Sequence, residues 1–268
     1  MRYVAPARGA VDMAVFGRAP LACWGEYAAL LQGPGWPPLG ALNERWPVDA
    51  RERFVAQTPA LLADGRHYEQ RIAEEGAIAT RERNWHDLFN ALAWLRYPAL
   101  KRALNAQQAA EISRVGIKQR TRPQCALTHF DEGGVMLLLR DERLLALWDA
   151  HDWHGLFWRE RTAWTDGRLA LVVFGHALFE HALTPEKLLV GKALAVLGGA
   201  DETAACEEVA RAIAAGRLLR DPQELRPLPL SGLPGWHADN AGEAFHREAA
   251  CYRPLRPGRS YPPALRLL

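Results

Sequence analysis

Three separated segments of the chain place carboxyl or imidazole side chains next to aromatic residues; they read NWHDLFN (84–90), FDEGG (130–134) and FGHALFE (174–180). In the third segment His176 and Glu180 are four residues apart, so they share one face if the segment is helical. With His86 and Asp131 they make two imidazoles and two carboxylates. Such a set can hold a divalent metal, Zn, Mn or Fe, with one coordination position left for water.

The neighbouring polar residues Asp87, Asn90 and Glu132 are candidates for a catalytic role. They would orient the metal ligands, and a spare carboxylate would act as general base. The spacings match no strong metal motif, and HEXXH is absent. The metal site is therefore a hypothesis based on residue types rather than on a signature.

Each of these residues also has a purely structural interpretation. Asp87 is placed to cap a helix, and His86 suits a hydrogen-bonded core histidine equally well. His176 and Glu180 fit a helical ion pair, and Asp131 fits a turn that contains two glycines. Both interpretations stay open on the sequence alone.

Three functions are consistent with this set of residues. The first is a metal-dependent hydrolase or lyase that acts on a small molecule through a metal-bound water. The second is a non-enzymatic protein that binds a small ligand over the same polar groups. The third is a buried polar network that only stabilises the fold. A GxSxG elbow, a GxGxxG loop and a P-loop are all missing, which disfavours a serine hydrolase and a classical nucleotide site.

The segment around His86 predicts a helix that begins after Asn84 and ends before Pro98. Its apolar residues cover one broad arc, while His86, Asp87 and Asn90 fall together on the opposite side. Further along, that opposite side is apolar as well, which predicts a buried helix. Buried polar groups need partners, so other elements must supply them.

The clearest β signal is a hairpin over 125–140, in which CALTHF and VMLLLR flank the four-residue link 131–134. The run RLALVVFG (168–175) is either a further buried strand or the start of a long helix. Helices are expected near 24–31, 99–113, 141–149, 153–164, 176–183, from Thr184-Pro185-Glu186 onward, and at 201–215. These patterns predict an α+β fold, predominantly α-helical, with one small antiparallel β element.

The chain shows no repeats and no low-complexity linker, so we expect a single domain over 1–268. Residues 1–48 are expected to form an N-terminal arm, 49–219 the main body, and 220–268 an irregular Pro-rich tail. Ten Trp residues predict that several indoles surround an interior pocket.

Composition narrows the class of protein. The 268 residues are 49% hydrophobic and 24% charged, as in folded soluble proteins, and the net charge of +2 comes without a basic block that would predict nucleic-acid binding. Four distant Cys residues favour reduced thiols and a cytoplasmic location. The N-terminus does not read as a signal peptide, and no apolar run is long enough to span a membrane.

Four ordered runs, YEQRIAEEGAIATRERNWHDLFNALAWLRYPALKRALN, ALTHFDEGGV, VVFGHALFEHAL and LPGWHADN, resemble the uncharacterised bacterial family DUF3025 over about residues 40–240. The resemblance implies one continuous domain. It implies no mechanism, because no biochemical function is established for that family. His129 stands where the resemblance leads us to expect an apolar residue, which makes it a poor candidate ligand.

Overall fold

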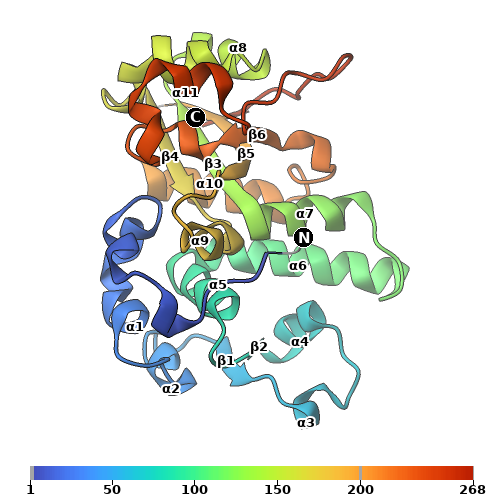
Figure 1. Cartoon of the computed structure of the whole chain (residues 1–268). Helices are drawn as coiled ribbons and strands as arrows, with labels where there is room; N and C mark the ends of the chain where they lie inside the picture. The colour runs from blue at the N-terminus through green and yellow to red at the C-terminus, as the bar shows by residue number, and fades with distance from the viewer. Residues whose placement is uncertain (1–2, 199–200, 268) are drawn as a thin grey trace.

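The computed structural model describes residues 3–198 and 201–267. It is a mixed α/β structure in which helices predominate and the strands form two sheets. In Figure 1 the larger sheet lies in the upper part of the molecule, α5 and α9 occupy the middle, and the smaller sheet lies at the lower end. Within the described residues, none of the helices has the length and apolar character needed to cross a membrane.

The larger sheet has the order β4-β3-β5-β6, and β7 also pairs with β5. Its strands are β3 (Gly134–Leu139), β4 (Leu169–Val173), β5 (Val190–Leu197), β6 (Arg226–Pro229) and β7 (Leu265–Arg266). β3 runs parallel to β5 and antiparallel to β4. All six residues of β3 are buried, as expected for a parallel pair covered on both faces.

The smaller sheet is the parallel pair β1 (Arg53–Ala56) and β2 (Ala77–Thr80). The helices that surround the two sheets are α1 (Ala28–Gln32), α2 (Leu39–Asn43), α3 (Pro59–Leu62), α4 (Tyr68–Glu75), α5 (Trp85–Arg96), α6 (Pro98–Val115), α7 (Arg122–Gly133), α8 (Glu142–Asp149), α9 (His176–Ala182), α10 (Glu202–Ala214) and α11 (Glu243–Glu248). α6 packs against α4, α5, α7 and α10, and α9 packs against α5 and α7. These contacts bring α4, α5, α6, α7 and α9 around one region.

The helix predicted around His86 is confirmed as α5. The side chain of Asn84 caps it by accepting a 3.0 Å hydrogen bond from the backbone N–H of Asp87. Its apolar arc is buried, with Phe89 and Leu92 fully so. The helices predicted at 99–113, 141–149, 176–183 and 201–215 are also present, as α6, α8, α9 and α10.

The predicted hairpin over 125–140 is wrong. Residues 125–130 belong to α7, which continues to Gly133, so Asp131 and Glu132 lie in the last turn of a helix rather than in a link between strands. A capping box between Thr121 and Gln124 starts this helix. β3 is present where the second strand of the hairpin was expected, and its antiparallel partner is β4, which confirms that 168–175 contains a strand.

Two further predictions need correction. No helix follows Thr184-Pro185-Glu186; the chain turns there and enters β5, which pairs with strands on both sides. The Pro-rich segment 220–268 is not simply irregular, because it supplies β6 and β7 to the larger sheet and also contains α11. In both places long-range pairing, which local sequence does not report, decides the structure.

Two glycine-containing segments touch at the start of α9. Gly175 donates a 2.7 Å backbone hydrogen bond to the carbonyl of Gly134. A Cβ atom at Gly175 would lie 2.6 Å from the carbonyl oxygen of Glu132, closer than side chains approach backbone atoms. This close approach places the first residue of α9, His176, beside the end of α7.

Replacing Gly175 by alanine is therefore expected to separate these two segments. We expect the free energy of unfolding to fall by about 1–3 kcal/mol, since the added methyl group overpacks a backbone contact. Urea unfolding of Gly175→Ala and of Gly40→Ala would check this. Gly40 lies in α2 with open space around its Cα, so its alanine variant should match or slightly exceed the wild-type stability. Equal stabilities for the two variants would contradict the prediction.

Candidate metal centre

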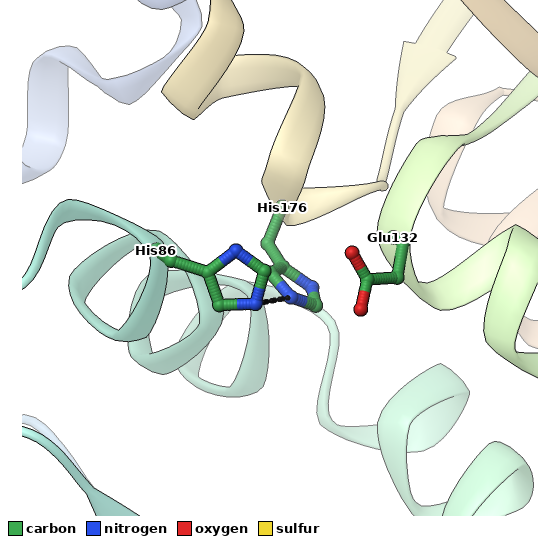
Figure 2. A group of neighbouring side chains, drawn as sticks. All are labelled: His86, Glu132 and His176. Carbon is green, nitrogen blue, oxygen red and sulfur yellow. Dashed lines mark hydrogen bonds between the residues drawn. The ribbon is translucent and has the colours of Figure 1, made fainter. Parts of the chain in front are cut away.

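Three helices bring potential metal ligands to one point. His86 lies in the first turn of α5, Glu132 in the last turn of α7, and His176 is the first residue of α9. One ligand atom from each of them lies within 4.8 Å of the other two. Figure 2 shows the two imidazoles joined by the dashed contact between their ring nitrogens, with the carboxylate of Glu132 beside His176.

The distance between the two imidazoles suits a shared ion. Nε2 of His86 and Nε2 of His176 are 3.0 Å apart, and the ring planes make an angle of 77°. Two imidazole nitrogens bound to one tetrahedral zinc would be roughly 3.3 Å apart, given metal–nitrogen bonds of about 2.0–2.1 Å. A movement of a few tenths of an ångström would therefore bring these two nitrogens to the spacing of a zinc site. Two imidazoles with one carboxylate is a donor set used for zinc and for non-haem iron.

Glu180 contacts the imidazole of His86 on the side away from the proposed metal position. It lies one turn after His176 on α9, and its Oε2 is 3.0 Å from Nδ1 of His86. A carboxylate at this distance keeps the hydrogen on Nδ1 and leaves the Nε2 lone pair directed at the site. Burial alone would lower the pKa of His86, but the hydrogen bond to Glu180 and the nearby carboxylates raise it overall. An incoming ion therefore competes with a proton for this ring.

Asp131 lies near the imidazole of His176, on the side away from the proposed metal position. Its Oδ2 is 4.0 Å from Nδ1 of His176, a buried atom with no hydrogen-bond partner in the described part of the chain. Burial lowers the pKa of His176 to about 3, so the ring is neutral. Burial would raise the pKa of Asp131, but the ammonium of Lys101, 2.6 Å from Oδ1, lowers it below its usual value.

The other candidates from the sequence lie around this centre. Asn90 accepts a 2.8 Å hydrogen bond from Lys101 and donates one of 3.0 Å to the hydroxyl of Tyr68. Arg81 donates hydrogen bonds to the carboxylate of Asp87. One comes from its guanidinium at 2.7 Å and another from its backbone N–H at 2.5 Å. Both oxygens of Asp87 thus have a partner outside the centre. The pKa of Glu132, whose carboxylate lies closer to the imidazoles, is raised, mainly because the surrounding groups partly shield the carboxylate from water.

These side chains line a cavity of about 250 Å³. It opens to solvent at the metal end, where the side chain of His86 is 27% exposed and Glu132 is exposed. Among the tryptophans of the described residues, Trp94 alone lines this cavity, so the prediction of several indoles around a pocket is wrong here. Most of the polar side chains that line the cavity come from five helices, α4, α5, α6, α7 and α9.

Several lining residues were missed by the sequence analysis. They are Tyr68 and Glu69 on α4 and Lys101, Asn105 and Gln108 on α6. A signal for the α6 residues exists, because positions 101, 105 and 108 share one face of a helix and carry polar side chains between apolar neighbours. Nothing local in the sequence marks Tyr68 and Glu69 as part of the same cavity.

Comparison with protein-family models shows to which family the chain belongs. A family model described as "Protein of unknown function (DUF3025)" matches residues 52–256. The chain belongs to DUF3025. The resemblance inferred from the sequence motifs is thus confirmed, and the match includes His86, Glu132, His176 and both carboxylates behind the imidazoles. No curated protein and no solved structure matches the chain. Membership of DUF3025 supplies no reaction, so the function has to be argued from the cavity.

Proposed function

We propose that the protein is a metal-dependent hydrolase or lyase acting on a small polar molecule. His86, His176 and Glu132 would hold the ion. The observation that carries this proposal is the convergence of their ligand atoms within 4.8 Å, at the solvent-exposed end of a cavity. The support is strengthened by the carboxylates behind the rings, since metal-bound histidines usually have such a partner on the second nitrogen.

This assignment changes the ligand set read from the sequence. Glu132 takes the place of Asp131 and Glu180 as the carboxylate ligand, because Asp131 is paired with Lys101 and Glu180 is bonded to the far side of His86. Three protein ligands leave a coordination position free for water or substrate. A divalent ion there would lower the pKa of bound water to about 7 or polarise a substrate oxygen.

A second candidate function is a metal-free protein that binds a small ligand. It is favoured by the 3.0 Å contact between the two Nε2 atoms, which can form a hydrogen bond without an ion. The cavity and its polar lining serve a binding protein as well as an enzyme. The two functions differ in whether the imidazoles bind metal and in whether a bound molecule is converted.

Metal content tests the proposal directly. We would measure the metal content of purified protein and titrate the metal-free protein with Zn²⁺, Mn²⁺ and, without oxygen, Fe²⁺. We expect about one ion per chain and a higher melting temperature, because an ion that binds only the folded state stabilises it. A panel of esters, amides and lyase substrates should then show turnover that chelation removes. Binding of none of the three ions would eliminate the metal enzyme and leave the second candidate.

A further inference from the structure

The cavity has a polar wall that leads away from the metal centre. Lys101 and Gln108 lie seven residues apart on the same face of α6, a separation of about 10 Å along a helix. At one end Lys101 reaches Asp131 of α7 at 2.6 Å, and at the other Nε2 of Gln108 reaches Thr128 of α7 at 3.0 Å. The wall that α6 and α7 form thus carries polar groups at both ends of a span of about 10 Å, and Leu104 and Leu127 also line it.

Glu69 faces this wall from α4. Nδ2 of Asn105 donates to Oε2 of Glu69 at 2.6 Å and to its backbone carbonyl at 2.8 Å, which fixes the carboxyl group in place. Within the described residues, no cation lies within ion-pair distance of it. Burial is the main cause that raises the pKa of Glu69, to about 7. Its Oε1 has no protein partner in that part of the chain and is free to meet a ligand.

The charges that line the cavity disfavour anionic ligands along the polar wall, away from the proposed ion-binding end. Both permanent cations are already engaged, Lys101 by Asp131 at 2.6 Å and Arg81 by Asp87 at 2.7 Å. Neither lining cation is therefore free to neutralise a phosphate or a carboxylate; Arg120, which donates to Thr128 at 2.8 Å, is exposed and lies outside the lining. The carboxyl groups outnumber these cations, since the lining contains Glu69, Asp87, Asp131 and Glu132. An anionic group placed along the wall would be desolvated without a counter-charge.

We propose that this wall recognises the part of the substrate remote from the metal, and that it selects an uncharged or amine-bearing molecule rich in hydroxyl or amide groups. Glu69 is the specificity-determining residue, accepting a hydrogen bond from a hydroxyl, amide or ammonium group of that molecule. Oε1 of Gln108 is a second acceptor, because its Nε2 is committed to α7. The substrate class rests on the proposed function, although binding to the wall does not require the ion.

Ligand-observed NMR with small fragments tests this selection. The panel has three equal classes, neutral, amine-bearing and anionic, with members such as N-acetylglucosamine, glucosamine and glucose 6-phosphate. We expect hits from the first two classes on zinc-loaded wild type, weakened about tenfold or more in Glu69→Leu, which loses a hydrogen bond to a carboxyl group. Glu69→Gln should keep the neutral hits and weaken the amine-bearing ones, and Gln108→Leu should weaken both.

The matched control is Glu74→Leu, which removes an exposed carboxylate from the same helix and should leave every hit unchanged. Mainly anionic hits, hits indifferent to both Glu69→Leu and Gln108→Leu, or no hits would overturn the selection, even if zinc binds normally. Absence of zinc binding with hits that still depend on Glu69 would overturn the metal enzyme and leave the polar wall standing. Glu69→Leu should bind zinc as wild type does, so the two failures are distinguishable.

Discussion

Replacing His176 by alanine is expected to abolish zinc binding, with a loss of affinity of roughly 100-fold or more. Its Nε2 lies 3.0 Å from that of His86, and burial keeps its ring neutral, so it offers a lone pair without first losing a proton. Removal leaves one imidazole and one carboxylate, too few for a tight site. Competition titration against a chromophoric zinc chelator would measure the change.

A graded series separates ligands from their supports. Glu132→Ala should lose affinity as His176→Ala does, and Glu132 is exposed, so this variant is not expected to unfold. Glu180→Gln should lose about 10–100-fold, since it weakens only the support behind His86. The matched control is His129→Ala, an exposed histidine on α7 outside this cavity, which should bind zinc like wild type. If both His176→Ala and Glu132→Ala bind zinc with wild-type affinity, these residues are not the metal ligands.

The fold was predictable where local signals agree with tertiary structure. The cap at Asn84 and the apolar arc of α5 predicted that helix correctly, because its burial follows from its own sequence. CALTHF contains apolar residues at 126, 127 and 130, a spacing that fits a short helix as well as a strand, and for this reason the predicted strand is wrong. The capping pair Thr121 and Gln124 was the signal that would have decided it. β5 had no comparable local signal and depends on its neighbours.

The sequence predicted which segments meet at the candidate site, but not which carboxylate would face the two imidazoles. The motifs containing His86 and His176 do meet, as expected, because α5 packs on α9. The roles of Asp131 and Glu132 depend on their being helical, since successive residues then point about 100° apart. One carboxylate faces Lys101 and the other joins the imidazoles. In the predicted turn over 131–134, the directions of the two carboxylates would be undetermined.

Lys101→Met is expected to reduce the free energy of unfolding by about 1–3 kcal/mol, because it leaves the partly buried carboxylate of Asp131 without its counter-charge. The side chain of Lys101 is 4% exposed and its ammonium is 2.6 Å from Asp131. It also lies 5.3 Å from the ring centre of Trp94 and 5.9 Å from that of Phe174, so a cation–π contribution is lost as well. Methionine keeps most of the length of the side chain, so the change tests the charge rather than the volume.

The double variant Lys101→Met/Asp131→Asn shows whether that loss belongs to the pair. Removing both charges leaves no stranded carboxylate, so we expect it to recover most of the stability lost by Lys101→Met, measured by urea unfolding without metal. The matched surface pair is Arg122 and Asp221, where Arg122 is 63% exposed and Arg122→Met should cost about 0–1 kcal/mol. If Lys101→Met costs no more than Arg122→Met, or the effects of the two changes at 101 and 131 simply add, Lys101 does not act by balancing the charge of Asp131.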